Sequence, residues 1–438
     1  MGRFPGSRGE RGEQDLDFQE TAAAGARPKL LFLCQSLPYP PDGGCHIRSY
    51  NVLRLLAREF DVSALFFYRR RTRPTPRDVR LGLEGMRVLG SVEAFPIPQE
   101  WSKIRLAWDH FRSLATQRVY TRFLHESADF SCELDRLLGG HDFDIVHVDS
   151  LDLSGYLPRL SHLPVVLTHH NVESRLLARR AAATNSRAMR QYLALQSRLT
   201  AKEERQWCGV ADLNIVVSDT DGDALRTIVD VPTVTVPNGV DTKLFRPGTG
   251  DRTGGIVFVG GAWWLPNRDG MEYFCEDILP RIRARIRNAP VTWVGHASED
   301  DRHHFLEKYD VRLTGYVDSV EPFVQEAGCY VVPLRIGGGT RLKILDAWAM
   351  AAPVVSTRLG CEGLSARDGE DILVRDEPDA FASAVCEVLR DEALRTRLGR
   401  AGRRTAEERF DWDVIGKDML RHYRGLLARP SAAVLTRA

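Results

Sequence analysis

The sequence predicts an α/β protein made of two doubly wound domains, each a parallel sheet covered by helices on both faces. At 438 residues the chain is longer than a typical single core allows. Short continuous apolar runs, typical of strands buried on both faces of a parallel sheet, alternate with helical patterns. This alternation stops at residues 246–255, a run rich in Gly, Thr and Pro, and then starts again. The two series of elements therefore indicate two domains.

The first series begins with a βαβ unit. A strand is predicted over residues 29–34, a helix over 47–58 and a second strand over 62–67. Further elements of this half are strands over 144–148, 165–168 and 213–217 and a helical stretch over 188–207.

The second series has the same design without a visible sequence repeat. Its predicted strands cover residues 256–259, 291–294, 311–314, 329–332 and 354–356. The first 28 residues are rich in Gly, Arg and Glu and have no apolar region, so we interpret them as a disordered tail. We expect a tail over 1–28, a first domain over 29–245, a second domain over 253–410 and a separate C-terminal segment over 411–428.

Composition and charge narrow the class of protein. Hydrophobic residues make up 43% and charged residues 27%, the profile of a soluble globular protein. The net charge of +1 gives no argument for nucleic-acid binding. The eight cysteines are scattered and form no CxxC pair, which favours core residues in a reducing compartment over zinc or redox sites. No run approaches the roughly 18 apolar residues of a membrane span, so we expect a cytoplasmic protein whose membrane contact is at most peripheral.

A glycine-rich loop followed by cations is the strongest candidate site. It follows the predicted strand over 329–332, and in an open α/β sheet ligands bind at the carboxyl ends of the strands. Adjacent glycines let the backbone approach a ligand, and a helix starting at Thr340 would direct free N–H groups at a diphosphate. The alternative is an ordinary strand–turn–helix with solvated cations, which the combination of glycines, cations and an acid disfavours. The predicted donor-binding residues here are Gly338, Gly339, Thr340, Arg341, Lys343 and Asp346.

A second loop follows the predicted strand over 256–259. Gly260 and Gly261 permit close approach of a phosphate, and Arg268 can neutralise it. Trp263 or Trp264 can stack on a base or a sugar. The alternative is a glycine-containing βα loop with aromatic residues that only pack.

The first domain supplies two weaker candidates at strand ends. Two adjacent glycines and an arginine follow the first strand, and a His-His-Asn-Val-Glu run follows the strand over 165–168. The polar groups can bond sugar hydroxyls or the departing group, whereas a plain turn and a structural histidine are the alternatives. The candidates are Gly43, Gly44, Arg48, His170, Asn171 and Glu173, and His147 is a weaker one.

A basic amphipathic stretch lies between these two candidates in the chain. Residues 101–114 place Trp101, Ile104, Trp108 and Phe111 on one helical face. Such a helix can lie on anionic lipid. We favour the other interpretation, a helix packed over the acceptor cleft.

Several of these motifs together resemble a known family. They are residues 40–44 (Pro-Pro-Asp-Gly-Gly), 168–173 (Thr-His-His-Asn-Val-Glu), 236–241 (Val-Pro-Asn-Gly-Val-Asp), 264–267 (Trp-Leu-Pro-Asn) and 337–343 (Gly-Gly-Gly-Thr-Arg-Leu-Lys). From about Lys29 to Leu427 the chain resembles the GT4-type, or group 1, glycosyltransferases. It looks closest to the branch found beside bacterial exosortase and exopolysaccharide systems.

The resemblance implies a GT-B fold, in which two Rossmann-like domains face a cleft. The second domain would bind a nucleotide-diphosphate sugar, the first a saccharide or lipid-linked acceptor, and the C-terminal helix would cross back to the first domain. It also implies transfer with retention of configuration and no metal or other cofactor. In that reaction Arg268 and Lys343 would stabilise the departing diphosphate, and His170 would contact the sugar.

The chain departs from the family pattern at two places. The family carries two glutamates separated by seven residues; the second falls on Asp346 and the first on Gly338. In the loop after the second domain's first strand, Gly261 replaces the family's arginine and Arg268 lies near its lysine. Two alternatives therefore stay open: a catalytically degenerate sugar-binding module, and a UDP-sugar epimerase on the same fold, although the acids that an epimerase needs are not evident.

Overall fold

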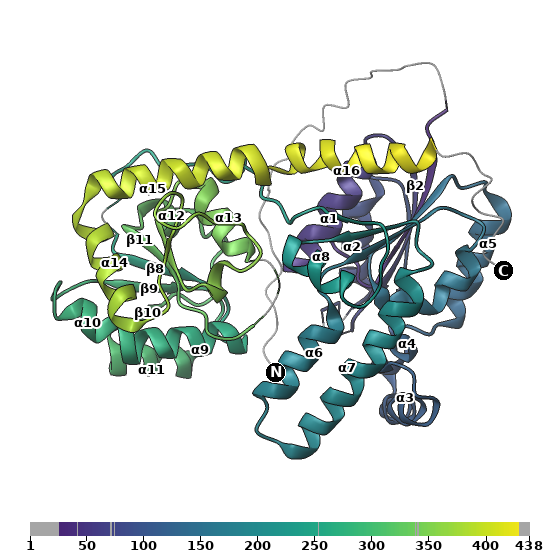
Figure 1. The fold of residues 1–438 in the computed structure, drawn as a ribbon, viewed down its shortest axis with the longest axis horizontal. Coiled ribbons are helices and arrows are strands. Elements are labelled where there is room, and N and C mark those ends of the chain that lie inside the picture. The colour runs from purple at the N-terminus through teal and green to yellow at the C-terminus, as the bar shows by residue number, and fades with distance from the viewer. Residues whose placement is uncertain are drawn as a thin grey trace.

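The computed structural model describes residues 26–428, except 42, 71, 74, 253, 338 and 340. Within them the chain forms two parallel sheets, each with helices on both faces, that lie side by side (Figure 1). The predicted two-domain α/β class is confirmed. The predicted tail lies outside the described residues apart from 26–28, which lead into the first strand.

The first sheet has the strand order β3-β2-β1-β4-β5-β6-β7, and all its pairs are parallel. Its strands are β1 (Lys29–Cys34), β2 (Asp61–Tyr68), β3 (Ser91–Pro96), β4 (Ile145–Val148), β5 (Val165–His169), β6 (Leu213–Val216) and β7 (Thr233–Thr235). The sequence did not indicate β3 and β7. Both lie at the edges of the sheet and are partly exposed, so neither carries a continuous apolar run.

The helices around this sheet divide into two layers. They are α1 (Gly44–Leu56), α2 (Pro76–Arg87), α3 (Lys103–Thr116), α4 (Tyr120–Leu124), α5 (Ala128–Gly140), α6 (Glu173–Ala183), α7 (Arg187–Cys208) and α8 (Asp219–Arg226), with 3-10 turns η1 (Pro98–Trp101) and η2 (Leu151–Leu160). Successive residues of β1 enter opposite layers: Leu30 and Phe32 join the core with α1, while Leu31 and Leu33 join the core with α5 and η2. This double burial explains the continuous apolar sequence of β1.

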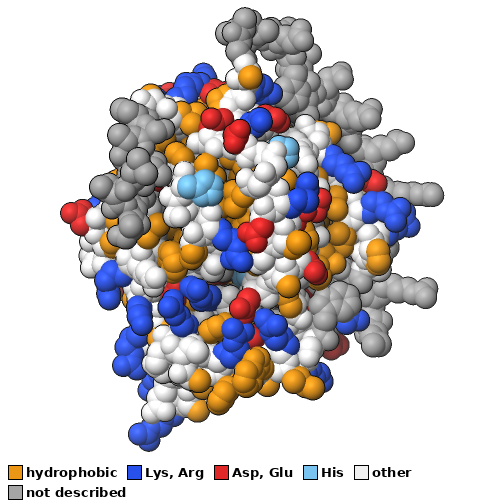
Figure 2. Space-filling view, turned by 90° about the vertical axis from the view of Figure 1, so that its right-hand side faces the viewer, with side chains coloured by type: hydrophobic (Ala, Val, Ile, Leu, Met, Phe, Trp, Pro, Cys, Tyr) orange, Lys and Arg blue, Asp and Glu red, His pale blue; other side chains and the backbone are white. Residues whose placement is uncertain are grey.

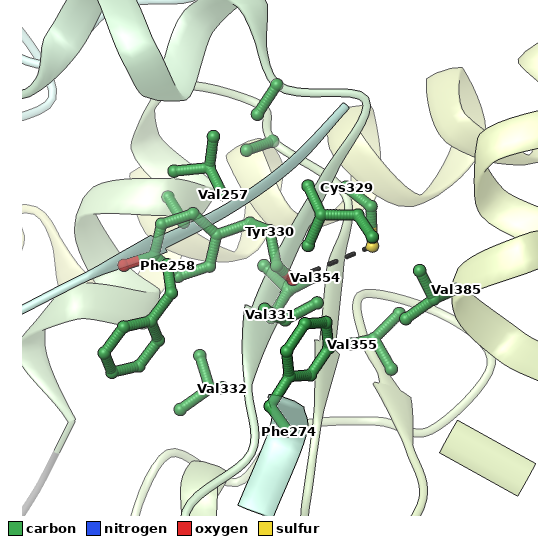
Figure 3. Packing of buried hydrophobic residues seen from close by; sticks show 14 of the residues in the cluster. Val257, Phe258, Phe274, Cys329, Tyr330, Val331, Val332, Val354, Val355 and Val385 are labelled. Carbon is green, nitrogen blue, oxygen red and sulfur yellow. Dashed lines mark hydrogen bonds between the residues drawn. The ribbon is translucent and has the colours of Figure 1, made fainter. Parts of the chain in front are cut away.

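The second sheet has the order β10-β9-β8-β11-β12-β13, again parallel throughout. Its strands are β8 (Ile256–Val259), β9 (Val291–Val294), β10 (Arg312–Leu313), β11 (Cys329–Val332), β12 (Val354–Ser356) and β13 (Leu373–Val374). Its helices are α9 (Leu265–Tyr273), η3 (Phe274–Ile278), α10 (Leu279–Arg283), α11 (Glu299–Tyr309), α12 (Glu321–Glu326), α13 (Leu342–Ala349), η4 (Leu359–Cys361), α14 (Pro378–Arg390), α15 (Glu392–Thr405) and η5 (Ala406–Phe410). Figure 3 shows side chains of β8, β11 and β12 packing with Phe274 and Val385 of the covering helices.

The last helix, α16 (Trp412–Leu427), returns to the first domain, as predicted (Figure 1). One face of it is part of the first domain's core and consists of Trp412, Ile415, Met419, Leu420, Tyr423 and Leu426. These positions recur at helical spacing. At its start, Asp411 forms a bridge with Val240 and accepts a hydrogen bond from the Thr242 backbone N–H (3.3 Å). The C-terminal segment therefore ties the two domains together.

In both sheets the strand order reverses at one point. That point lies between β1 and β4 in the first sheet and between β8 and β11 in the second. Connections leave such a point toward opposite faces of the sheet, so a crevice opens at the carboxyl ends of its two strands, where open α/β sheets bind ligands. All four predicted site loops follow a strand at or next to one of these crevices.

Candidate functional site

Lys343 lies at the crevice of the second sheet, in the first turn of α13. Its Nζ donates a hydrogen bond to Asn267 Oδ1 (2.8 Å) and lies 4.2 Å from the centre of the Phe258 ring. Burial, together with the nearby charge of Arg341, lowers the pKa of Lys343 to about 7. This ammonium has no carboxylate partner among the described residues, so an anion entering the crevice would be its counter-charge.

Asp346 lies one turn further along α13. The described residues provide no hydrogen bond to its carboxylate, and burial raises its pKa to about 7, with a smaller contribution from Glu321. A partly buried acid without a partner can accept hydrogen bonds from ligand hydroxyls. The structure therefore places a cation and an acceptor on the same helix, as the sequence predicted.

The loop after β8 holds Lys343 in place through Asn267. Gly260 has φ of +153°, and a Cβ on it would lie 2.5 Å from Asn267 Nδ2, so only glycine fits. Asn267 Nδ2 also donates to the Gly261 carbonyl oxygen (3.0 Å). Trp263, 71% exposed, extends from the same loop and meets Trp264 edge to face.

Arg268, predicted to neutralise the donor phosphates, is directed elsewhere. Its Nη2 donates to Asp301 Oδ1 (2.7 Å) and its Nε to Glu272 Oε1 (3.2 Å). These two carboxylates on α11 and α9 neutralise the guanidinium. Lys343, which has no carboxylate partner among the described residues, is therefore better placed than Arg268 to meet an anion, and the catalytic roles of both residues stay predictions.

The glycine loop brings the two domains into contact. Gly339 has φ of +78°, and a Cβ on it would lie 3.0 Å from Asn171 Oδ1 in the first domain. Gly44, at the start of α1, lies against Leu342 of α13. Predicted residues from both domains thus meet across the cleft, whereas Gly338 and Thr340 lie outside the described residues. The helix that was expected to start at Thr340 begins at Leu342.

Arg341 is the N-cap residue of α13 and is 9% exposed. Burial lowers its pKa, partly offset by Glu362. Close to it, Arg179 of α6 makes a bidentate ion pair with Glu362 of the second domain (3.1 and 3.2 Å). A small cavity between the domains is lined by Asn171, Arg179, Gly339 and Glu362, among others.

On the first-domain side, Asp149 organises the crevice. It directly follows β4, is fully buried and lies 3.3 Å from His170 Nε2 and 3.4 Å from His147 Nε2 through its carboxylate oxygens. Ser49 Oγ also donates to it, and Cys34 Sγ lies 3.3 Å away. Burial alone would raise the pKa of Asp149, but the charges and hydrogen bonds of His170 and His147 hold it well below its usual value.

This network reaches the crossing helix. His147 Nδ1 hydrogen-bonds to the hydroxyl of Tyr423 in α16, and the ring stacks on Phe32 at 4.5 Å. The pKa of His147 is lowered mainly by burial. His147 is therefore a core residue that links α16 to Asp149. His170 ends the same network with its side chain 8% exposed, and it directly precedes Asn171, which meets Gly339 of the second domain.

Arg48 is 1% exposed, and its Nη1 donates to Pro237 O and Asn238 Oδ1 (both 3.1 Å). Burial lowers its pKa to about 10. These contacts show a structural anchor between α1 and the segment that leads to the second domain. Contact of Arg48 with an acceptor stays a prediction, as does that of Gly43.

Asn171 and Glu173 form the rim of the cleft at the start of α6. Asn171 Nδ2 donates to Glu173 Oε1 (3.3 Å). Burial raises the pKa of Glu173 to about 7, with a further contribution from Asp152. A carboxyl group with this pKa can exchange protons near neutral pH.

Sequence reasoning missed Asp149 as a site residue and did not assign a role to Asn267. A signal for Asp149 was available, since it is a polar residue directly after an apolar strand. Its partners come from β1, α1, β4 and the residue after β5, and their proximity depends on strand order, which the sequence does not show. Among the described residues, no group of three His, Cys, Asp or Glu side chains is placed to hold a metal ion.

Comparison with known proteins agrees with this geometry. The family model of glycosyl transferases group 1 matches residues 253–391, and that of glycosyltransferase family 4 matches residues 43–244. The chain is 33% identical over 142 residues to the lipopolysaccharide core biosynthesis glycosyltransferase LpsE of Rhizobium meliloti, a match that spans 30% of this chain and only 41% of that protein. It is 24% identical to a glycogen synthase of Mycobacterium tuberculosis over 76% of this chain and 78% of that one.

Solved structures share the fold. The sucrose-phosphate synthase of Thermosynechococcus elongatus superposes with a TM-score of 0.68 at 18% identity, covering 91% of this chain and 99% of that chain. HepE of Anabaena, solved in complex with UDP, gives a TM-score of 0.61 at 15% identity, covering 91% and 100%. One family model lies on each domain and the solved structures share the GT-B architecture, so the chain is a glycosyltransferase with a first domain of family 4 and a second domain of group 1.

Proposed function

We propose that this enzyme transfers a sugar from a nucleoside diphosphate sugar to an acceptor hydroxyl with retention of configuration and without a metal ion. The observation that carries the proposal is the meeting of two crevices. Lys343 and the glycine loop of the second domain lie across the cleft from Asn171 and the adjacent His170 of the first. A donor bound over α13 would present its sugar to that side.

The second domain has the groups that a departing diphosphate needs. The bond from the anomeric carbon to the diphosphate oxygen breaks, and negative charge gathers on the leaving group. Lys343 and Arg341 supply fixed positive charge, and Asp346 can accept hydrogen bonds from the ribose. Charges held in place before the reaction stabilise the transition state without reorganisation.

The first domain positions the sugar. Asp149 fixes the orientation of the His170 ring, which would contact a hydroxyl of the transferred sugar. The acceptor oxygen attacks the anomeric carbon from the face that the diphosphate leaves, and its proton passes to a diphosphate oxygen. Atoms and charge balance without an enzyme nucleophile.

Inversion of configuration is the competing stereochemical outcome. It would require a general base on the face of the sugar opposite to the diphosphate. Glu173, with a pKa of about 7, is the carboxyl group that fits such a role by acidity. In this structure it is held by Asn171 at the rim of the cleft. The anomeric configuration of the product distinguishes the two mechanisms.

The acceptor class that we propose is a saccharide or a lipid-linked saccharide, in exopolysaccharide or glycoconjugate synthesis. Its support is the partial match to a lipopolysaccharide core glycosyltransferase. We also propose that the chain belongs to the glycosyltransferase branch associated with exosortase and exopolysaccharide systems, which fits the same class of acceptor.

The first experiment measures thermal stabilisation and slow donor hydrolysis with UDP-, GDP-, ADP- and TDP-sugars, with and without EDTA. One donor is expected to raise the melting temperature and to be hydrolysed equally with EDTA. Lys343→Ala and Asp346→Ala are expected to lose both effects, whereas Lys308→Ala, an exposed lysine on α11, keeps them. Nuclear magnetic resonance of the glycoside formed with an added alcohol acceptor then gives the configuration of the transferred sugar, which a glycosidic bond preserves. The inverted anomer, or a requirement for a divalent ion, would refute the corresponding part of the proposal.

A further inference from the structure

Helix α3 exposes its apolar face to solvent. Ile104 is 84% exposed, Trp108 53%, Phe111 57% and Leu114 44%, and the rings of Trp108 and Phe111 stack with centroids 5.4 Å apart. The favoured expectation of a helix packed over the acceptor cleft is therefore wrong for this face; the side chain of Trp101 lies outside the described part of the chain.

Polar contacts fix α3 in this orientation. Its inward side carries Asp109 and Ser113, both fully buried. Arg105 Nε donates to Asp109 (2.9 Å), and Gln196 of α7 donates to Ser113 Oγ (3.0 Å). A rotation that buried the apolar face would break the hydrogen bonds that join Ser113 to Gln196 and His110 to Tyr192 of α7, and it would leave buried polar groups without partners, which is costly. The helix is thus held with its hydrophobic side outward.

The helices next to α3 form a basic surface. The α6–α7 hairpin, residues 173–208, contains eight Lys and Arg against three Glu, a net charge of +5. Two of its three acids are buried, while its cations are exposed, namely Arg175, Arg179, Arg180, Arg187, Arg190, Arg198, Lys202 and Arg205. His110 of α3 bonds to the Tyr192 hydroxyl of α7 (2.8 Å), so the two surfaces adjoin.

Figure 2 views the molecule from the side on which α3 lies. It shows hydrophobic side chains at the lower edge, with many Lys and Arg side chains beside them. Among the described helices none is long and apolar enough to cross a bilayer. An outward apolar stripe next to cations is the pattern of a helix that lies in the plane of a membrane surface.

We propose that the exposed face of α3 and the cations of the α6–α7 hairpin, apart from Arg179, which pairs with Glu362 across the cleft, form a docking surface for an anionic lipid bilayer. Trp108, Phe111 and Ile104 would enter the interface between headgroups and acyl chains, and the arginines would pair with anionic headgroups. Charge argues against a second copy of this chain as the occupant. A symmetric dimer through α3 would bring two hairpins of the same positive charge close together.

Vesicle flotation of the full chain tests the docking surface. The protein is expected to float with vesicles that contain about one-third phosphatidylglycerol, to float weakly with pure phosphatidylcholine, and to be partly released by 0.5 M salt, because charge attraction is screened. Failure of the wild-type protein to float with anionic vesicles overturns the proposal.

Matched variants locate the surface. Trp108→Glu/Phe111→Glu is expected to reduce flotation at least tenfold, and Arg187→Glu/Arg190→Glu to reduce it and weaken its salt dependence. Leu306→Glu, a 52% exposed leucine on α11 of the second domain, is the control and keeps flotation. Undiminished flotation of the α3 variant contradicts the proposal. A second contradicting result is light scattering that shows the wild-type protein as a dimer and the α3 variant as a monomer.

Donor hydrolysis without vesicles separates this proposal from the proposed function. The α3 and hairpin variants are expected to keep the wild-type rate and melting temperature, since neither touches the donor crevice. If the variant with both glutamates on α3 unfolds, two other measurements still test the proposal. They are the flotation of the single variant Trp108→Ser and the dependence of wild-type flotation on lipid charge.

Discussion

At the scale of single residues, the site depends on burial that shifts pKa values toward neutrality. Lys343 and Asp346 share one short helix, and burial makes the charged form of each less favourable. Asp149 shows the opposite effect, since two histidines keep it ionised although it is fully buried. The donor side is therefore sensitive to pH near 7, whereas the carboxylate that positions His170 is not.

The two shifts predict a narrow pH profile of kcat/KM for the donor. Asp346 acquires its charge as the pH rises through about 7, and Lys343 loses its charge over the same range. The profile should therefore be bell-shaped with a maximum near neutral pH, since kcat/KM reports the groups of the free enzyme.

Substitutions assign each limb of that profile. Lys343→Arg removes the alkaline limb because a guanidinium stays charged, and Asp346→Asn removes the acid limb. Initial rates of donor hydrolysis between pH 5.5 and 8.5 measure both. A wild-type profile that is flat over this range, or an alkaline limb that persists in Lys343→Arg, would contradict the assignment.

At the scale of elements, the βα loops are shaped by glycines at positions that no other residue can occupy. Gly260 is one case, because its backbone has φ of +153° and Asn267 fills the space of a Cβ. The loop after β8 therefore acts on Lys343 indirectly, by holding the amide that accepts its hydrogen bond.

Gly260→Ala is expected to displace Asn267 and to raise the KM for the donor about tenfold, through the loss of roughly 1–2 kcal/mol of ordered contact. Strain at the positive φ should also lower the free energy of unfolding by about 1–3 kcal/mol. Gly425→Ala on α16 is the control, because a Cβ there meets no atom within 4 Å and alanine favours the helix. Denaturant unfolding and donor kinetics measure the pair; an unchanged KM in Gly260→Ala would show that Asn267 does not position Lys343.

At the scale of the whole molecule, the two domains are joined in two ways. Helix α16 buries an apolar face in the first domain's core, which is a permanent connection. The ion pair between Arg179 and Glu362 crosses the open side of the cleft and is partly exposed, with side chains 51% and 26% accessible. An exposed pair of this kind contributes about 0–1 kcal/mol, so it can open without unfolding the protein.

Arg179→Ala and Glu362→Ala are each expected to change kcat and KM for the donor together, by about two- to fivefold, with less than about 1 kcal/mol effect on stability. The double variant should resemble either single one, since both remove the same contact. Arg281→Ala breaks an exposed ion pair with Asp379 inside the second domain and should leave the kinetics unchanged. Additive kinetic effects in the double variant would show that the pair does not act as a unit.

The sequence alone determined the architecture and the positions of the loops. Strands such as β1, β8 and β11 are buried on both faces, and that burial leaves a continuous apolar run that can be read without the fold. Glycines and cations after these strands predicted the donor crevice from the sequence as well. A backbone that comes close to a ligand requires glycine at that position, and this requirement is visible without the fold. The partly exposed edge strands β3 and β7 carry no such run and were missed.

Only the tertiary structure decided which side chains meet. Asp149 becomes the centre of a network because β1, β4 and β5 are neighbours in the sheet, and Tyr423 reaches it because α16 crosses back from the second domain. Arg268 is turned toward Asp301 and Glu272, and α3 shows its apolar face to solvent because Ser113 and His110 bond to α7 on its inward side. Local sequence patterns record how deeply a residue is buried, whereas the partner of a polar side chain depends on segments that are distant in the chain and brought together only by the fold.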